Sequence, residues 1–204
     1  MKEKLSMAAK LATGVLVFGA WLLMIRSAAG TLSDTGVRSL RYFTVLSNFL
    51  CAIAALIHFG FLAVRKSAPR WVLRLSYAGT AAVGVTLMVV LLFLGPLYGY
   101  ASMYDGANLW FHLVVPLASA LDFCLLDREG TFSLRESPLA VLPMALYGAG
   151  YVGNILAHGV GAWPNSNDWY GFLMGGPVWG AVIAAVILFG TWGLALLLRL
   201  PRRR

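Results

Sequence analysis

Residues 75–95 read LSYAGTAAVGVTLMVVLLFLG, and this stretch decides the fold because it contains no charged side chain. A helix of about 20 predominantly apolar residues is long enough to cross the hydrocarbon core of a bilayer. Similar windows recur along the chain, and the sequence predicts six spans at approximately residues 11–24, 43–64, 72–96, 109–126, 138–158 and 174–198. The expected fold is therefore an all-α polytopic membrane protein, a six-transmembrane-helix bundle that forms a single domain over residues 1–204.

The composition of the whole chain supports this interpretation. Of its 204 residues, 60% are hydrophobic and 12% are charged, and the mean hydropathy is +0.78. A soluble domain of this size could not bury so much apolar surface, and a disordered chain needs the opposite composition. Cys51 and Cys124 are too few for a disulfide-dense secreted module and are expected to be small core residues. The composition also excludes a typical cytosolic enzyme.

The net charge of +8 is explained by membrane topology, and we expect no nucleic-acid partner. Only Arg26, Arg38 and Arg41 fall on one side of the spans. The thirteen basic residues on the other side are Lys2, Lys4, Lys10, Arg65, Lys66, Arg70, Arg74, Arg128, Arg135, Arg199, Arg202, Arg203 and Arg204. The positive-inside rule then predicts that both termini are cytoplasmic. We expect an integral membrane protein whose first span is retained rather than cleaved as a signal peptide.

Polar side chains inside the predicted spans are few, and each needs a reason because lipid cannot hydrogen-bond to them. Thr44 lies near the outer end of the second span, and Asn48 follows one turn later on the same face. Asn108 and His112 open the fourth span, which also runs from outside to inside. These residues therefore share an outer layer of the bundle.

A further polar pair is expected to reach this layer from the opposite direction. The fifth span runs outward and ends with Asn154 and His158, which repeat the four-residue offset of Asn108 and His112. We therefore predict that three spans, the second, fourth and fifth, deliver Thr, Asn and His side chains to one outer layer.

Two more ionisable residues lie deeper, toward the cytoplasmic half. His58 and Asp122 are each ten residues beyond the outer group, which is about 15 Å along a helix axis. Asp122 is either a proton-relay carboxylate or a structural group that hydrogen-bonds between helices or pairs with a basic residue such as Arg74. His58 is either a packing histidine with satisfied hydrogen bonds or a functional residue.

The histidines and cysteines offer no recognisable ligand set. Their positions give neither a His-x-x-x-His nor a Cys-x-x-Cys spacing. The chain also contains no phosphate loop, dinucleotide fingerprint or Gly-x-Ser-x-Gly motif. We therefore predict no metal site and no cofactor.

Thr44 and His112 together have the chemistry of a nucleophile and its base. A threonine hydroxyl is a weak nucleophile until a base takes its proton, and histidine is the usual base at neutral pH. Both residues fall in the first turns of helices whose N-termini face outward, where the helix dipole disfavours an imidazolium and stabilises an oxyanion. Asn48 or Asn108 could add a side-chain donor. The structural alternative is that Thr44 caps or back-bonds within its helix and His112 hydrogen-bonds a neighbour.

Several short motifs resemble a known family. The sequence RYFT at residues 41–44, the Asn108-x-x-x-His112 pair with Pro116, and six spans with cytoplasmic termini resemble the FAR-17a/AIG1-like superfamily. Residues 163–172, WPNSNDWYGF, and the stretch HLVVP that begins at His112 are more closely similar to its bacterial Pr6Pr-type integral membrane proteins. The resemblance covers most of the chain, and it implies an integral protein of the bacterial inner (plasma) membrane. Animal members of this superfamily are threonine hydrolases that cleave fatty acid esters of hydroxy fatty acids within the membrane.

The resemblance implies that Thr44 is the nucleophile and His112 the base of an intramembrane lipid ester hydrolase. A lipid or fatty acyl ester would enter laterally from the bilayer and form an acyl-threonine intermediate; acyl transfer to another acceptor shares this covalent step. Asp168 would orient one of the histidines, and residues 163–170 would cover the mouth. His158 is the reserve candidate for the base. The residues expected to line the pocket or support an oxyanion are Asn48, Asn108, Asn154, His158 and Asp168.

Other functional classes remain open from the sequence. A small transporter or channel would use Asp122, His58 and His112 as a proton or ion path. A non-catalytic membrane protein would bind lipid or a partner through the aromatic outer loop, and it would need neither Thr44 nor His112.

Overall fold

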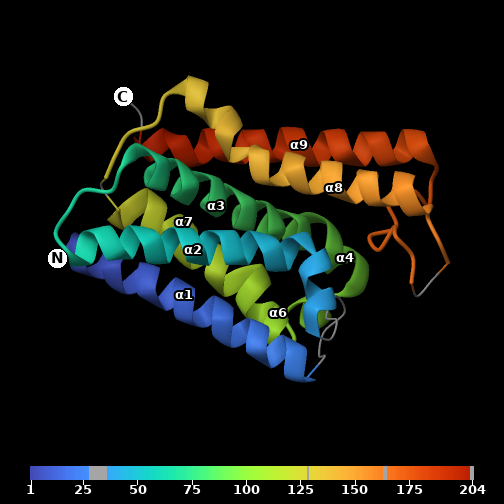
Figure 1. Cartoon of the computed structure of the whole chain (residues 1–204), viewed down its shortest axis with the longest axis horizontal. Helices are drawn as coiled ribbons and strands as arrows, with labels where there is room; N and C mark the ends of the chain where they lie inside the picture. Colours follow the sequence, from blue (N-terminus) through green and yellow to red (C-terminus); the bar gives the residue numbers. More distant parts are fainter. Residues whose placement is uncertain (28–35, 128, 163–164, 203–204) are drawn as a thin grey trace.

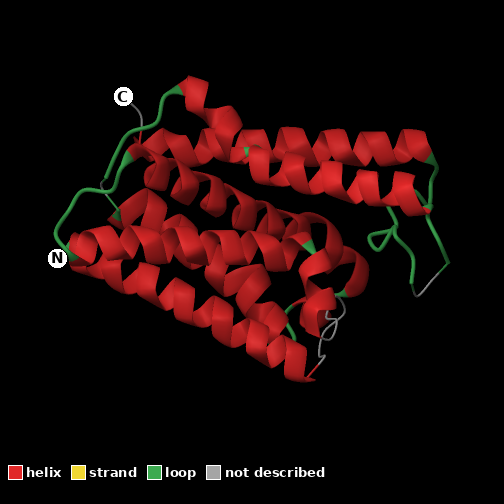
Figure 2. Ribbon diagram, in the orientation of Figure 1, coloured by secondary structure: helices red, strands yellow, loops and turns green. Residues whose placement is uncertain are grey.

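The computed structural model describes residues 1–27, 36–127, 129–162 and 165–202 of the chain. Every regular element in these ranges is a helix, and they contain no strand (Figure 2). The segments that are long and apolar enough to cross a membrane are Lys2–Arg26, Phe43–Ala63, Arg70–Tyr98, Ala107–Leu126, Leu134–His158 and Pro177–Arg202. The predicted all-α fold with six candidate spans is therefore confirmed, whereas membrane insertion and the direction of insertion stay predictions.

Some spans are single helices and others are built from consecutive helical turns of different type. The first two spans and their connection are α1 (Lys2–Ser27), η1 (Gly36–Arg41) and α2 (Phe43–Ala63). The third span and the turn after it are α3 (Arg70–Val89), η2 (Val90–Leu94), α4 (Gly95–Tyr98) and α5 (Tyr100–Met103). The fourth span is α6 (Ala107–Leu109), η3 (Trp110–Val114), α7 (Val115–Leu121) and η4 (Asp122–Leu126). The last two spans are η5 (Leu134–Ala140) with α8 (Leu142–His158), and α9 (Pro177–Arg199) with η6 (Leu200–Arg202).

The first span begins earlier than predicted. The hydropathy pattern places its start at Leu11, but α1 begins at Lys2 and Lys10 lies within it. The prediction was wrong because Lys10 was interpreted as a flanking charge, whereas its side chain is buried against acidic groups of the fourth span and the loop after it. Lys10 is therefore part of the bundle core.

The two ends of the described chain lie at the same end of the bundle, at the left of Figure 1. Lys2 Nζ donates to the carbonyl of Leu125 at 3.3 Å, and the N–H of Phe132 donates to the carbonyl of Arg202 at 2.9 Å. Having both chain ends at one end of the bundle is what an even number of successive spans requires, because each span runs opposite to the one before it. We call this end of the bundle the terminal end and the opposite end the distal end.

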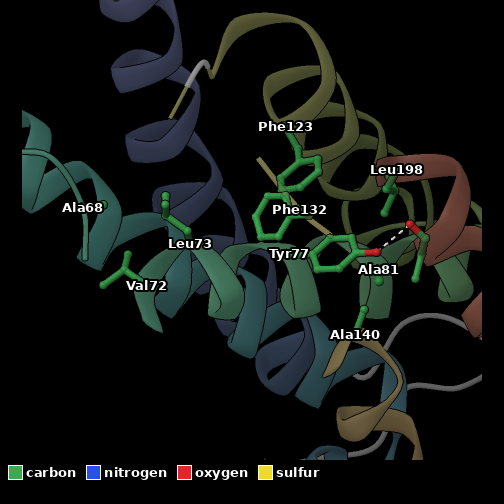
Figure 3. Packing of buried hydrophobic residues seen from close by; sticks show 10 residues of the cluster. Ala68, Val72, Leu73, Tyr77, Ala81, Phe123, Phe132, Ala140 and Leu198 are labelled. Carbon is green, nitrogen blue, oxygen red and sulfur yellow. Dashed lines mark hydrogen bonds between the residues drawn. The ribbon is translucent and has the colours of Figure 1, made fainter. Parts of the chain in front are cut away.

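The terminal end is held together by an aromatic cluster around Tyr77 of α3 (Figure 3). The Tyr77 ring stacks on Phe123 with 5.6 Å between centroids and packs on Phe132 at 4.7 Å. Its hydroxyl donates to the carbonyl of Ala195 in α9 at 2.6 Å. Tyr77 therefore joins α3 to the fourth span, to the loop before η5 and to the last span.

α8 and α9 are the least buried of the spans. Their most apolar windows are 22% and 17% buried, compared with 56% for the third span. Figure 1 shows them running together and extending past the distal ends of α1 and α2. Their exposed faces carry large apolar side chains such as Leu156, Val178 and Phe189. Such faces are suited to contact with lipid rather than with water.

Candidate functional site

Thr44 is the second residue of α2 and lies at the distal end. The N-cap of α2 is Tyr42, whose own side chain makes no capping hydrogen bond. The carbonyl of Thr44 accepts hydrogen bonds from Ser47 Oγ at 3.1 Å and from Asn48 Nδ2 at 2.7 Å. The Thr44 hydroxyl makes no hydrogen bond within the described part of the chain. Helix capping, the structural role considered for this hydroxyl, is therefore not observed.

His112 is fully buried, and its ring has a defined orientation. Nδ1 lies 2.8 Å from the carbonyl oxygen of Met103. A carbonyl can only accept, so Nδ1 carries the proton and Nε2 of the neutral ring carries the lone pair. Nε2 is buried and has no hydrogen-bond partner among the described residues. The ring therefore presents a basic nitrogen toward the interior of the bundle.

The backbone around His112 departs from α-helical geometry for an identifiable reason. Pro116 has no N–H, so the carbonyl of His112, four residues earlier, lacks its usual helical donor. The chain forms a π-turn at η3, in which the N–H of Val115 bonds to the carbonyl of Trp110. Such turns carry one extra residue and recur at functional sites.

Asn48 connects α2 to the segment that carries His112. Its Nδ2 donates to the carbonyl of Phe111 at 3.2 Å as well as to Thr44, so the two candidate catalytic residues lie on facing segments. Asn48 Oδ1, Asn108 Nδ2 and His112 Nε2 are buried without a hydrogen-bond partner among the described residues. Buried polar atoms are normally paired, so this group marks a polar site. We call Thr44, Asn48, Asn108 and His112 the distal site.

The loop between α8 and α9, which carries Trp169 and Tyr170, is fixed over the distal end of α2. We call it the aromatic loop. Tyr170 Oη accepts a hydrogen bond from the N–H of Phe43 at 2.8 Å, which satisfies a free amide of the first helical turn. Tyr147 of α8 donates to the carbonyl of Arg41 at 2.6 Å and accepts from Trp169 Nε1 at 3.1 Å. Burial raises the pKa of Tyr170 well above its usual range, so its hydroxyl stays protonated. The loop therefore covers the helix terminus next to Thr44.

Asp168 organises this loop and does not orient a histidine. Its carboxylate accepts a hydrogen bond from the Tyr151 hydroxyl and 2.9 Å hydrogen bonds from the N–H groups of Phe172 and Leu173. The prediction that Asp168 orients a catalytic histidine was wrong, because these donors occupy the carboxylate. Residues 163–164, at the start of the predicted cover, lie outside the described residues.

Asn154 and His158 do not join the distal site. The Tyr147 hydroxyl marks the level of the α2 terminus on α8, and His158 lies eleven residues farther out, which is about 16 Å along the helix. His158 is exposed and donates to the carbonyl of Asn154 at 3.1 Å, while Asn154 Nδ2 donates to Asn167 Oδ1 at 3.1 Å. The prediction of a common layer was wrong for this pair because α8 extends beyond α2. His158 is therefore no longer a reserve candidate for the base.

A second polar group lies at the terminal end around Lys10. Lys10 Nζ is 2.6 Å from Asp122 Oδ2 and 3.3 Å from Asp127 Oδ2. Arg74, the partner suggested for Asp122 by the sequence, pairs with Glu136 instead at 2.9 Å. Asp122 is therefore held by a charge from the first turns of α1, which the sequence analysis placed before the first span.

His58 belongs to the same group. Its Nε2 lies 3.1 Å from Glu129 Oε2, and its Nδ1 lies 3.6 Å from Asp127 Oδ2. Arg202 reaches Asp127 Oδ1 at 3.4 Å from the other side. Burial would raise the pKa of Asp127, but the nearby charges of Lys10 and Arg202 outweigh it and lower that pKa. We call Lys10, His58, Asp122, Asp127, Glu129 and Arg202 the terminal charge cluster.

A small cavity borders the terminal charge cluster. Its volume is about 20 Å³, which is enough for about one water molecule. Asp122 Oδ1 is buried and unpaired among the described residues. The polar residues lining the cavity are Lys10, Thr13, Cys51, Ser76, Thr80, Ser119, Asp122 and Asp127.

Hydroxyl groups continue from this cavity toward the distal site along α2. Ser119 lies 2.8 Å from Thr80 Oγ1 and accepts from Cys51 Sγ at 3.2 Å. Nearer the distal end, Ser47 Oγ lies 3.2 Å from Thr86 Oγ1. The core of the bundle is therefore polar over much of its length.

Most of the terminal charge cluster was missed by sequence reasoning. Lys10 and Arg202 were interpreted as charges that flank the spans, and Asp127 and Glu129 were not recognised as candidate residues. The available signal was the spacing of Lys10 on α1, because it lies four residues after the buried Ser6 and seven before the buried Val17. In the described residues, no three His, Cys, Asp or Glu side chains are placed to hold a metal ion.

The chain was also compared with known proteins. No protein-family model, no curated protein and no solved structure matches this sequence or fold. The superfamily resemblance therefore stays a prediction from short motifs.

Proposed function

We propose that this protein is an intramembrane lipid ester hydrolase in which Thr44 is the nucleophile and His112 the general base. The observation that carries the proposal is the hydrogen bond from His112 Nδ1 to the Met103 carbonyl, which leaves Nε2 as a buried, unpaired base. A second support is the free Thr44 hydroxyl on the facing helix. The motif resemblance to threonine hydrolases agrees with these roles.

The first half of the reaction would form an acyl-threonine. His112 Nε2 takes the proton of the Thr44 hydroxyl while Oγ1 attacks the ester carbonyl carbon. The bond from that carbon to the alcohol oxygen breaks, and the imidazolium returns the proton to the departing alcohol. No hydrogen bond joins Thr44 to His112 within the described residues, so the proposal requires that this hydrogen bond forms when substrate binds.

The second half would release the acid. His112 removes a proton from water, the hydroxide attacks the acyl carbon, and Thr44 Oγ1 leaves with that proton. The sequence offered Asn48 or Asn108 as donor to the oxyanion. Asn108 Nδ2 is favoured because Asn48 Nδ2 is already bonded to two carbonyls, whereas Asn108 Nδ2 is unpaired among the described residues.

The setting that we propose is the bacterial inner membrane, with both termini in the cytoplasm and the distal site toward the outer face. The supporting observation is the excess of Lys and Arg at the terminal end. The substrate class is a fatty acyl ester that enters from the bilayer, and an acyl transferase would share the covalent step.

A fluorophosphonate probe for serine and threonine hydrolases tests this proposal in detergent-solubilised protein. We expect labelling of the wild type and its loss in Thr44→Ala and His112→Ala. Matched controls are Thr86→Ala, a buried threonine of the adjacent helix, and His158→Gln, an exposed histidine. Labelling that survives Thr44→Ala would disprove the nucleophile assignment, and equal loss in Thr86→Ala would show that only packing had been disturbed.

A specific observation favours proton or ion transfer as a second candidate function. The buried Lys10–Asp122 pair borders a water-sized cavity, and an ionisable group within a span is a functional candidate by default. Reconstituted vesicles containing a pH-sensitive dye distinguish the two functions. Transfer predicts proton movement that Asp122→Asn abolishes and Thr44→Ala preserves. Hydrolysis predicts that labelling by the fluorophosphonate probe is lost in Thr44→Ala and kept in Asp122→Asn. A non-catalytic lipid-binding protein needs neither Thr44 nor Asp122.

A further inference from the structure

A large pocket opens at the terminal end between α3 and η5. Its volume is about 630 Å³, within the range of small-molecule sites. Arg70 and Arg74 line it from the first turns of α3, and Arg135 and Glu136 line it from η5. Neither the distal site nor the terminal charge cluster contributes to this pocket. We call it the arginine pocket.

The charge of the arginine pocket is positive and is held in place by Glu136. Arg70 bonds to this carboxylate through both Nε and Nη2, and Arg74 Nε bonds to it at 2.9 Å. The N–H and hydroxyl of Ser133 donate to the same carboxylate at 3.0 and 3.1 Å. The pocket is therefore lined by three arginines and one carboxylate, and the hydrogen bonds from Arg70, Arg74 and Ser133 fully engage that carboxylate.

Donors remain available in the arginine pocket after these contacts. In the described structure Arg74 uses only Nε for Glu136, so both of its Nη groups are free for a ligand, and its side chain is 47% exposed. Arg135 is exposed on the neighbouring wall. Guanidinium groups with paired N–H donors match the oxygens of a phosphate group. A phosphate is therefore the anion that this arrangement recognises best.

The surroundings indicate where that phosphate comes from. Trp71, next to Arg70 at the end of the third span, is 55% exposed, as expected for an aromatic side chain at a membrane interface. Leu139 adds an apolar wall on the side of the fifth span. We propose that the arginine pocket binds a phosphate ester, supplied as the headgroup of an anionic phospholipid. The volume leaves room for glycerol beside the phosphate.

The experiment measures phosphatidylglycerol binding to the full chain in neutral detergent by native mass spectrometry. We expect phosphatidylglycerol to bind more tightly than phosphatidylcholine. Arg74→Gln with Arg135→Gln should raise the Kd for phosphatidylglycerol by about tenfold or more, since each basic side chain near an anionic lipid contributes about 1 kcal/mol. Arg70 and Glu136 stay intact, so the capping of η5 is preserved.

The matched control is Arg65→Gln with Lys66→Gln. It removes the same charge from exposed residues near the start of α3 that do not line the arginine pocket. We expect the Kd to stay within about twofold of wild type, as screened surface charges contribute little to a specific site. An equal loss in both double variants, or no loss in the pocket variant, would overturn the proposal. If the pocket variant does not fold, the exposed Arg135→Gln alone replaces it, with a smaller expected loss.

A third arm adds inorganic phosphate to separate the two sources of the ligand. Phosphate that binds wild type and displaces phosphatidylglycerol, but fails to bind the pocket variant, would identify free phosphate as the ligand and overturn the lipid assignment. Lipid binding that is insensitive to phosphate supports the headgroup assignment. This measurement reads binding alone, so its outcome is independent of the Thr44 chemistry.

Discussion

Replacing Lys10 by Met tests the buried ion pair of the terminal charge cluster directly. The change keeps an unbranched side chain that is one heavy atom shorter, and it removes a charge that lies 2.6 Å from Asp122 and 3.3 Å from Asp127. Both partners are buried, so Asp122 loses its only cation within ion-pair distance among the described residues, while Asp127 keeps Arg202. Breaking a buried pair by removing one partner costs about 3–5 kcal/mol.

The compensating variant supplies the second half of this test. Lys10→Met combined with Asp122→Leu removes both charges and fills the space with apolar groups. Replacing a buried pair in this way is close to neutral or stabilising by about 1–4 kcal/mol. The double variant should therefore be more stable than Lys10→Met alone by a few kcal/mol, on the order of the loss in the single variant.

Denaturation in mixed micelles, followed by circular dichroism, measures these free energies of unfolding. Lys4→Met is the matched control because Lys4 is an exposed lysine on the same helix, and its replacement should change stability by no more than about 0.5 kcal/mol. The reasoning is refuted if Lys10→Met costs no more than Lys4→Met, or if the losses of Lys10→Met and Asp122→Leu simply add in the double variant.

Three further changes test other parts of the structure. The pKa of Asp127 is lowered in the folded protein, so its charge contributes stability above the ordinary carboxyl pKa. This contribution is lost as pH falls through the lower folded-state pKa. Unfolding measured from pH 6 downward should therefore show acid destabilisation in wild type that is smaller in Asp127→Asn. Gly79→Ala would place Cβ 3.0 Å from the α2 backbone and should destabilise by about 1–3 kcal/mol, whereas Gly190→Ala meets nothing within 4 Å and should be neutral or stabilising in the same assay. Tyr151→Phe removes a donor to the buried Asp168 carboxylate and should lower the free energy of unfolding by about 1–3 kcal/mol. Residues 165–176 should be cleaved by protease faster than in wild type. Unchanged proteolysis would argue against a role of this hydrogen bond in holding the loop.

The spans were predictable because hydropathy reports directly on the bilayer, where backbone groups must be satisfied within helices. Their centres need no knowledge of tertiary contacts. The start of α1 was not predictable in the same way. Lys10 resembles a flanking charge until Asp122, 112 positions away, is placed beside it. Only the packing of the first span against the fourth brings these groups together.

The distal site was predicted in part. Thr44, Asn48 and His112 come to facing segments because the second and fourth spans both begin at the distal end, as the predicted alternation of spans implied. The tautomer of His112 depends on a carbonyl in α5 that has no sequence signature. His158 was misplaced because depth was counted from each predicted boundary, and that assumes that all helices end at the same plane.

The π-turns of the fourth span affect how such a protein can change over evolution. A π-turn carries one residue more than an α-turn, and each residue rotates a helix by about 100°. A deletion within η3 would therefore restore α-helical phase and turn His112 relative to Ser119 and Asp122 without altering the rest of the span. Single-codon insertions or deletions can thus change the orientation of each end of the fourth span separately. The distal site can diverge while the terminal charge cluster keeps its geometry, or the reverse.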